Sequence, residues 1–194
     1  MATEAGNGTS RRRVLGGVLG VTSSYFTVTD ARGRERPPER MPPQVSDRFQ
    51  VVSPGPLADR VVRPDDVTFD APPLEAFAYE PVYGTLRNGS RLYRLLITRL
   101  EPSRMDRLAQ AAHADGVLVF SAVCTHKGCT VNGWDATRLR FRCPCHLSEF
   151  APLETGRPVD GPATRSLPML PVGVDGEGYV AALDGFNRKP GFQR

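Results

Sequence analysis

Two short segments hold all four cysteines and two of the three histidines of this 194-residue chain. The first reads Cys-Thr-His-Lys-Gly-Cys over residues 124–129, and the second reads Cys-Pro-Cys-His-Leu-Ser over residues 143–148. Two thiolates and two imidazoles can hold a metal centre, and the two remaining cysteines can be joined to each other. A site shared between the segments requires a fold that brings two loops side by side.

Composition favours one soluble domain rich in strands and loops. The apolar and charged fractions, 40% and 24%, are those of an ordinary globular protein. The 18 prolines and 19 glycines favour an all-β architecture over a helical bundle. Lys127 and Lys189 are the only lysines, so nearly all positive charge is carried by arginine. A coding bias explains this preference for arginine as readily as a function does. The net charge of +4 comes without a basic stripe interleaved with aromatic residues, so we expect no nucleic-acid partner.

The N-terminus predicts export. Residues 10–15, Ser-Arg-Arg-Arg-Val-Leu, resemble a twin-arginine motif, and an apolar run of eight residues follows from Val14 to Val21. Eight helical residues span about 12 Å, far below the ~30 Å of a hydrocarbon core, so the run is typical of a signal peptide rather than a membrane span. We predict a twin-arginine signal region over residues 1–29. A disordered basic tail is the alternative, since no clear A-x-A cleavage site follows.

This signal predicts a periplasmic protein, or one on the outer face of the cytoplasmic membrane. Any membrane association would run only through the N-terminal segment. Twin-arginine export carries folded proteins, which suits a cofactor inserted in the cytoplasm. The periplasm also permits a disulfide.

The remaining chain shows strand-like runs between turn signals. Residues 30–79 are predicted to form a Pro-rich linker and edge strands, because prolines interrupt their short apolar pieces. Asn88-Gly89 lies between two β-rich runs and predicts a hairpin, and Asp175-Gly176 predicts another. Residues 102–112 are predicted to form one short amphipathic helix. Its apolar face would comprise Met105, Leu108, Ala109 and Ala112.

The metal motifs are placed by their flanking strands. A strand over residues 117–123 leads into the first motif, and a returning strand over residues 139–142 leads into the second. We therefore expect both motifs on loops at the ends of adjacent antiparallel strands.

The two motifs together, C-T-H-x-G-C and C-P-C-H-x-S, resemble the cluster-binding loops of the Rieske iron–sulfur proteins, in the branch that contains a disulfide. The likeness spans residues 80–185, leaving residues 186–194 as a tail. It includes Gly161-Pro162-Ala163, which is similar to the proline loop that covers the cluster in that family. The resemblance implies an all-β fold, with a Rieske-type antiparallel β-sandwich base, a small cluster-binding subdomain over residues 117–165 and one short helix.

The resemblance also implies the cofactor, a Rieske-type 2Fe-2S cluster, and its ligands. Cys124 and Cys143 would bind one iron and His126 and His146 the other, while Cys129 and Cys145 would form a disulfide. Neutral imidazoles in place of two thiolates raise the reduction potential of such a cluster. The same imidazoles can release a proton when the cluster is oxidised, so electron and proton transfer can couple.

Four further residues are candidates for the surroundings of the cluster: Lys127, Ser148, Phe150 and Pro162. Lys127 replaces a leucine, and Leu147 a glycine, of the quinol-oxidising Rieske proteins. Phe150 stands where those proteins often carry a tyrosine, whose hydroxyl donates to a ligand sulfur. Ser148 keeps a hydroxyl that can donate toward a bridging sulfide. Residues 146–150 look more like the small subunits of arsenite-oxidase-type enzymes.

The predicted function is that of an exported electron-transfer subunit with no catalytic residue of its own. It would be the small subunit of a periplasmic oxidoreductase similar to arsenite oxidase, passing electrons between a larger catalytic subunit and a cytochrome-like acceptor. One alternative is the Rieske subunit of a quinol:cytochrome c oxidoreductase. Another, of a different class, is a structural zinc-binding module, although zinc knuckles space their ligands differently. A ring-hydroxylating oxygenase is disfavoured, because the chain has no room for a large catalytic domain.

Overall fold

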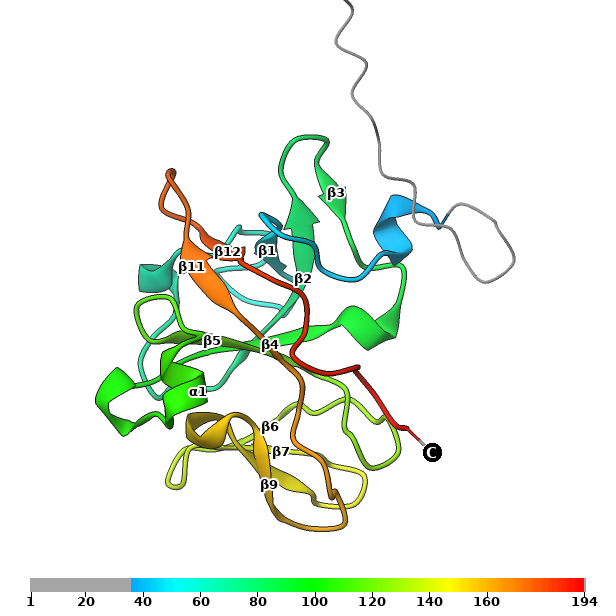
Figure 1. Cartoon of the computed structure of the whole chain (residues 1–194), viewed down its shortest axis with the longest axis vertical. Coiled ribbons are helices and arrows are strands. Elements are labelled where there is room, and N and C mark those ends of the chain that lie inside the picture. The colour runs from blue at the N-terminus through cyan, green and yellow to red at the C-terminus, as the bar shows by residue number, and fades with distance from the viewer. Residues whose placement is uncertain (1–35, 194) are drawn as a thin grey trace, which may run out of the picture. The chain divides into compact units, whose positions relative to one another are not determined.

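The computed structural model describes residues 36–193, so the predicted signal region lies outside the described residues. Residues 36–193 form two antiparallel β-sheets, one α-helix and several single turns of 3-10 helix (Figure 1). This confirms the predicted all-β fold with one short helix. No helix among the described residues is long and apolar enough to cross a membrane.

The larger sheet has eight strands and nearly closes on itself. Its order is β10-β5-β4-β2-β1-β12-β11, with β3 paired to β2 outside this path. The strands at the two ends of the path, β10 and β11, are separated along the chain only by Pro171, which brings the edges of the sheet close together. The bounds of these strands are β1 Arg48–Val51, β2 Leu74–Glu80, β3 Thr85–Leu86, β4 Leu95–Arg99, β5 Val117–Ser121, β10 Met169–Leu170, β11 Val172–Val174 and β12 Val180–Ala182.

The smaller sheet is a meander of four strands that carries the second metal motif. Its order follows the chain, with β6 Gly133–Asp135, β7 Arg140–Arg142, β8 Glu149–Ala151 and β9 Arg157–Asp160. A bulge interrupts the pairing of β8 with β9 at Glu149 and Phe150. The smaller sheet lies below β4 and β5 in the view of Figure 1.

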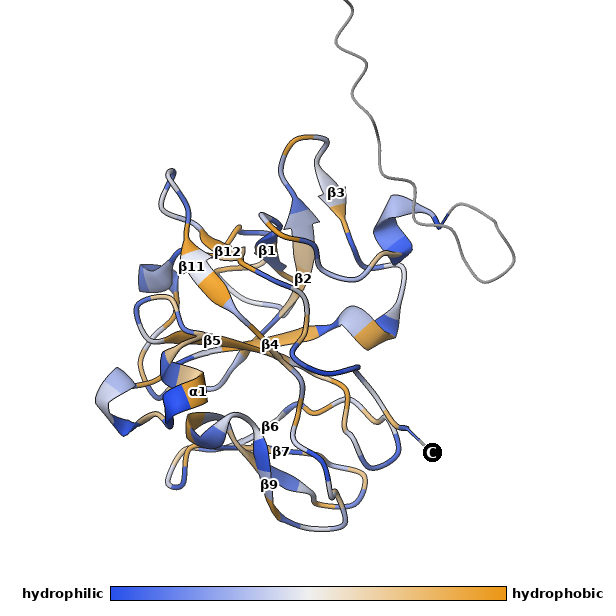
Figure 2. Cartoon of the chain, in the orientation of Figure 1, coloured by the Kyte–Doolittle hydropathy of each residue, from blue (hydrophilic) through white to orange (hydrophobic). Residues whose placement is uncertain are grey.

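Strands β4 and β5 separate two apolar cores because successive side chains point to opposite faces. Ile97 and Val119 belong to the core inside the larger sheet, whereas Leu96 and Phe120 belong to the core that also contains Phe141 of the smaller sheet. All five residues of β5 are buried, as expected for a strand covered on both faces. Figure 2 shows this strand pair as an apolar band through the middle of the molecule.

The predicted helix is shorter than its sequence pattern suggests. Residues 102–104 form a 3-10 turn, and α1 comprises only Arg107–Gln110. The Asp106 carboxylate accepts a hydrogen bond from the Ala109 N–H at 2.8 Å, so the helix begins anew at Asp106. Leu108 is 61% exposed, so its assignment to the apolar face was wrong. Met105, Ala109 and Ala112 are buried as predicted.

The hairpin predicted at Asn88-Gly89 is absent from the described structure. Strand β3 instead pairs back onto β2 through residues 81–84, and β4 pairs with β2 and β5. Gly89 is required for a different reason, since a Cβ there would lie 2.7 Å from Cγ of Arg40 and 3.0 Å from the carbonyl oxygen of Glu39. The Gly89 N–H donates to that carbonyl at 2.8 Å. The second predicted hairpin, at Asp175-Gly176, is confirmed between β11 and β12.

The segment before residue 79 contributes more to the sheet than predicted. Strand β1 pairs with both β2 and β12 and is therefore interior, so its assignment as an edge strand was wrong. Asp47, directly before it, forms a buried ion pair with Arg87, with Nε and Oδ2 at 2.5 Å. Arg87 also donates to the carbonyl of Pro38 at 2.9 Å, in the 3-10 turn Pro38–Arg40. The remaining 3-10 turns are Pro64–Asp66, Arg91–Tyr93 and Pro152–Glu154.

Candidate metal centre

The two Cys/His segments form six-residue loops with the same backbone hydrogen bonds. In the first, the Cys124 N–H donates to the carbonyl of Cys129 at 2.8 Å, and the Gly128 N–H donates to the carbonyl of Cys124 at 2.9 Å. In the second, Cys143 donates to Ser148 at 2.9 Å and Leu147 donates to Cys143 at 3.0 Å. The fifth residue of each loop has a positive φ, 77° at Gly128 and 58° at Leu147. The first residue of each loop is thus presented by an equivalent turn.

Both loops lie at one end of the β6–β7 hairpin. The first loop ends shortly before β6, the second begins directly after β7, and Gly133 is paired with Arg142 at that end of the hairpin. The predicted placement at the ends of adjacent strands needs one correction. The strand before the first loop, β5, belongs to the larger sheet, so the first loop connects the two sheets.

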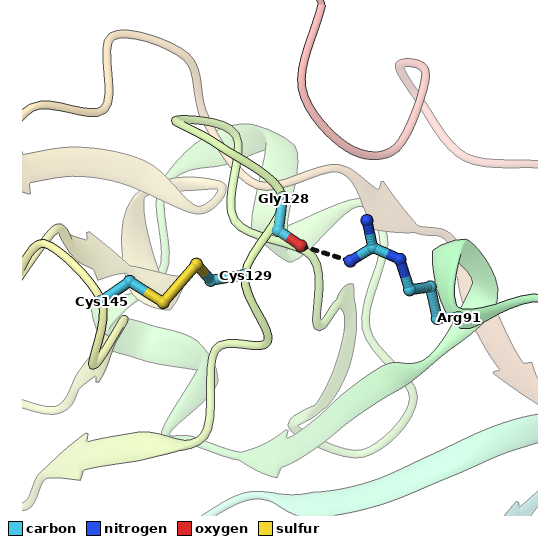
Figure 3. The surroundings of a disulfide bond; sticks show 4 residues. All are labelled: Arg91, Gly128, Cys129 and Cys145. Carbon is cyan, nitrogen blue, oxygen red and sulfur yellow. Dashed lines mark hydrogen bonds between the residues drawn. A yellow bond between two sulfur atoms is a disulfide. The ribbon is translucent and has the colours of Figure 1, made fainter.

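A disulfide joins the loops. It links Cys129 to Cys145, whose Cα atoms are 6.6 Å apart, and this confirms the predicted pair (Figure 3). Closing a loop of this length stabilises a fold by about 3 kcal/mol. The Sγ atom of Cys143 lies within 4.8 Å of both disulfide sulfurs. The disulfide therefore lies directly beside one of the two free thiols.

The two free cysteines, Cys124 and Cys143, are buried in the core between the sheets. Burial raises the pKa of the Cys124 thiol, and the neighbouring Cys143 thiol raises it further. A buried thiol is a poor nucleophile, because the thiolate lacks a stabilising positive charge. A metal ion bound between them would supply that charge.

The two histidines lie against each other at the surface end of the same site. The rings of His126 and His146 are 4.7 Å apart between centroids and nearly perpendicular. His146 is exposed and His126 is half-buried. The Nδ1 atom of His126 is buried without a hydrogen-bond partner, which is unfavourable unless another group satisfies it. Desolvation, together with His146 and Lys127, lowers the pKa of His126 and so favours the neutral imidazole that metals bind.

These donors suit an iron–sulfur centre: two buried thiols, two imidazoles and an unsatisfied buried ring nitrogen. A model of the Rieske [2Fe-2S] domain family matches residues 103–171, which include both loops. The chain contains a Rieske [2Fe-2S] domain. Its cofactor is accordingly a 2Fe-2S cluster, as the sequence motifs predicted.

Known relatives share this Rieske domain over about half of the chain. The "cytochrome bc1 complex Rieske iron-sulfur subunit" of Corynebacterium glutamicum is 40% identical over 100 residues, which are 52% of this chain and 24% of that protein. The "putative respiratory nitrate reductase subunit Rieske" of Haloferax mediterranei is 39% identical over 94 residues, 48% of this chain and 41% of that one. The chain thus spans about a quarter of the Corynebacterium subunit.

Among solved structures, the soluble domain of Rieske protein II from Sulfolobus acidocaldarius is similar to this chain. The sequence identity is 21% and the TM-score is 0.37, and the match covers 46% of this chain and 61% of that one.

The segment that carries Pro162 packs against both loops of the Rieske domain. Ser148 Oγ accepts a hydrogen bond from the Ala163 N–H at 3.2 Å, which ties the segment to the second loop. Thr125 Oγ1 donates to the carbonyl of Arg165 at 2.6 Å, which ties it to the first. Gly161 has a φ of 77°, and a Cβ there would lie 2.6 Å from Cα of Ser148. Residues 161–165, the proline segment, therefore need a glycine at their first position.

Two contacts of the first loop were not predicted from the sequence. Arg91, in the turn before β4, donates through Nη1 to the carbonyl of Gly128 at 2.7 Å (Figure 3). Nothing in the sequence near Arg91 indicates this contact, because only the fold brings the residue to the loop. Thr125 does lie inside the first motif, and its hydroxyl was the available signal.

The other predicted surroundings occupy distinct positions. Lys127 is exposed, with Nζ 4.9 Å from the centre of the Phe192 ring. Phe150 is fully buried in the core that contains both free cysteines. Ser148 is also fully buried, and because its Oγ accepts from Ala163, its hydroxyl hydrogen remains available for donation. Pro162 is exposed at the surface of the proline segment.

Proposed function

We propose that this Rieske domain transfers single electrons as a subunit of an exported respiratory oxidoreductase. The observation that supports the proposal best is the orientation of the donor set. The thiols of Cys124 and Cys143 are each 1% exposed, whereas His146 lies at the surface. A cluster held by these groups has a protein-buried side and an imidazole side that faces outward. Electrons can then enter and leave through the imidazole edge without a substrate binding at the metal.

The proposed ligands are Cys124 and Cys143 on the inner iron and His126 and His146 on the outer one. Because histidine ligands are neutral, the cluster would carry less negative charge and would be easier to reduce. Its reduction potential would therefore be higher than that of an all-cysteine cluster. Ser148 would donate its free hydroxyl hydrogen to a cluster sulfur and favour the reduced state further. The Cys129–Cys145 disulfide would hold the two loops at the spacing that the ligands require.

The metal content tests this assignment directly. Purified protein should contain two irons and two acid-labile sulfides per chain, and the reduced form should give the electron paramagnetic resonance signal of a histidine-ligated cluster. Replacing His126 or His146 with cysteine should shift that signal toward the form of an all-cysteine cluster. Stoichiometric zinc without labile sulfide would instead establish the structural zinc module.

The partners of the subunit are proposed to be a larger catalytic subunit and a cytochrome-like acceptor. The names of the relatives support a role in a respiratory complex, since they refer to a bc1 complex and to a nitrate reductase. Lys127 at the exposed edge supports an enzyme of the arsenite-oxidase type, because a cation is unfavourable where an apolar quinone docks. The similarity to the Corynebacterium subunit supports the quinol:cytochrome c complex as the second candidate.

Isolation of the native complex distinguishes these candidates. Affinity-tagged protein should be purified from its own cells, and its companions analysed for molybdenum and for haem. Molybdenum in the complex would support the first candidate. Haem b and haem c without molybdenum would support the second.

Export remains a prediction from residues 1–29. Replacing Arg11, Arg12 and Arg13 with lysine should trap the folded protein in the cytoplasm, because lysine does not reproduce the paired guanidinium groups. Fractionation followed by immunoblotting measures the distribution. Unchanged export of the variant would contradict twin-arginine transport.

A further inference from the structure

A group of cations lies around the first loop and the C-terminal tail. We call it the cationic collar; it comprises Arg91, Lys127, Arg165 and Lys189. Arg91 donates to Gly128, as described above, and Lys127 lies over the Phe192 ring. Arg165 Nη2 donates to the carbonyl of Lys189 at 3.5 Å. The collar therefore follows one continuous surface from the turn before β4, across the first loop, to the tail.

The tail that carries Lys189 and Phe192 is packed against this surface. A Cβ at Gly191 would lie 3.1 Å from Cδ2 of Leu92 and 3.7 Å from Cγ1 of Val123, directly before the first loop. The carbonyl oxygen of Gly191 is also 3.5 Å from Nη2 of Arg165. Phe192 is 45% exposed. The tail thus presents an exposed aromatic ring and a lysine beside the redox site.

The charges of the collar are not neutralised within the described residues. None of its four members forms an ion pair there, whereas Arg48 pairs with Asp175 and Arg87 with Asp47. Each of the three arginines Arg138, Arg140 and Arg142 also lies within ion-pair distance of Glu149, and Arg138 of Asp135 as well. Both lysines of the chain belong to the collar. Uncompensated cations therefore gather at this surface.

Two exposed carboxylates occur on neighbouring segments, but they do not cancel the collar. Asp160 accepts from the Gly161 N–H at 2.7 Å, and Asp184 accepts from the Gly185 N–H at 2.7 Å. Four cations against two carboxylates leave a positive surface. It lies next to the exposed imidazole edge, because Lys127 follows His126 directly in the chain.

We propose that the cationic collar docks a redox protein whose own electron-exchange surface is rich in carboxylates. The proposal rests on the proposed function and specifies the chemistry of the partner. Charges of one sign around a redox edge guide an oppositely charged partner and raise its association rate by about 10- to 1,000-fold at low ionic strength. Phe192 would provide an apolar contact at the centre of this charged surface.

The sign of the charge that the collar presents can be measured with two small oxidants of opposite charge. The reduced domain gives one electron either to hexacyanoferrate(III), forming hexacyanoferrate(II), or to tris(phenanthroline)cobalt(III), forming the cobalt(II) complex, and no bond is made or broken. Second-order rate constants are measured by stopped flow at about 10 mM salt, where the Debye length is about 30 Å, and at about 1 M, where it is about 3 Å. The anionic oxidant should lose rate as salt increases.

Lys127→Glu and Lys189→Glu should each lower the rate with the anion and raise it with the cation at low salt. We expect the ratio of the two rate constants to change about tenfold in the double variant. Any change in the reduction potential shifts both rates in the same direction and cancels from the ratio. Arg107→Glu is the matched control, because Arg107 is exposed on α1 and forms no ion pair among residues 36–193. Figure 1 shows α1 on the opposite side of the view from the C-terminal end of the chain.

An equilibrium measurement complements the kinetics. Methylation with ¹³C labels the two lysines for NMR. Two redox-inert, paramagnetic probes are then compared, the anion hexacyanochromate(III) and the cation hexaamminechromium(III). The anion should broaden the Lys189 methyl signal more than the cation does. Equal broadening by both probes would contradict the proposal that the collar is a positively charged docking surface. A rate ratio that responds no more to Lys127→Glu than to Arg107→Glu would overturn it as well.

Two other outcomes are distinguishable. Failure of both oxidants to accept electrons would overturn the proposed function rather than the collar alone. Co-sedimentation of the domain with phosphatidylglycerol vesicles, lost in the double lysine variant, would assign the collar to a lipid surface and overturn the protein partner.

Discussion

The two metal-binding loops share a backbone fold but differ in how the protein holds them. Antiparallel pairing closes both loops, Val123 with Thr130 at the first and Arg142 with Glu149 at the second. The first loop has Gly128 at its positive-φ position and receives the Arg91 hydrogen bond. The second loop exposes four consecutive residues, 144–147, and has a leucine at the equivalent position. The disulfide and the proline segment hold both loops, but only the first also has the Arg91 contact, so we expect the second to depend more on the disulfide and the proline segment.

Removal of the disulfide should have the largest effect and should fall on the second loop. Replacing Cys129 and Cys145 with serine should lower the free energy of unfolding by about 3 kcal/mol. The cluster should still assemble but be lost more easily. Chemical denaturation measures the stability, and hydrogen exchange at the equivalent amides of Gly128 and Leu147 compares the loops. Equal loosening at both amides would contradict the asymmetry.

Gly161→Ala should displace the second loop through backbone contact. Its Cβ would lie 2.6 Å from Cα of Ser148 and 2.8 Å from the Leu147 carbonyl oxygen, at a φ of 77°. We expect a loss of about 2 kcal/mol, of which the left-handed backbone alone accounts for about 1–2 kcal/mol. Thermal unfolding measures it, with Gly176→Ala as the control, because a Cβ at Gly176 would meet no atom within 4 Å. Similar effects of both variants would show that the proline segment does not constrain the loop.

Ser148→Ala should lower the reduction potential by removing the hydroxyl that the second loop offers to the cluster. A hydrogen bond to a charged centre contributes about 1.5–3 kcal/mol, and ~59 mV corresponds to about 1.4 kcal/mol for one electron. We expect a shift of some tens of millivolts up to about 100 mV, measured by protein-film voltammetry. Phe150→Tyr should raise the potential if its new hydroxyl reaches a ligand sulfur. An unchanged potential in Ser148→Ala would show that this hydroxyl does not face the cluster.

Arg91→Ala should affect the first loop alone. The Gly128 carbonyl loses a donor at 2.7 Å, and a single hydrogen bond of this kind contributes about 1 kcal/mol. Hydrogen exchange at Gly128 should accelerate, while exchange at Leu147 should not change. Arg91→Lys tests the geometry of the contact, because a lysine retains the charge but not the guanidinium plane. Acceleration at both loops in Arg91→Ala would show that they respond as one unit.

Leu147→Gly should make the second loop resemble the first and slightly stabilise it. The leucine has a φ of 58° and is 57% exposed, so a glycine relieves backbone strain and loses little buried surface. The expected gain is about 0.5–1 kcal/mol in thermal unfolding, because part of the relief is offset by the greater freedom of glycine in the unfolded chain. A loss of stability would mean that the leucine side chain itself holds the second loop.

The sequence was informative where single residues carry the chemistry. Cysteines and histidines at fixed offsets indicate a metal centre wherever the chain places them, and the predicted disulfide is present. Asn88-Gly89 was misleading because its glycine meets a close approach of Glu39, which lies 50 residues earlier. The contact of Arg91 with the first loop was not predicted for the same reason. Both residues are determined by tertiary contacts between distant segments, and no local pattern encodes such contacts.

Strand β1 shows which part of the fold could not be predicted from the sequence. Its short run between prolines has the local character of an edge strand, yet it lies between β2 and β12. Interior position depends on which strands arrive on either side. In this chain one of those strands, β12, comes more than a hundred residues later.

The position of the proline segment also sets an order of events during synthesis. Residues 161–165 follow both loops in the chain, and the larger sheet is complete only after β12. A ribosome therefore releases the four cysteines before the proline segment and the last strands of the larger sheet. During translation the loops thus emerge without this cover, and the enclosed site forms only when nearly the whole polypeptide has emerged. A nascent chain stalled before Asp160 would carry every proposed ligand and still lack the segment that encloses them.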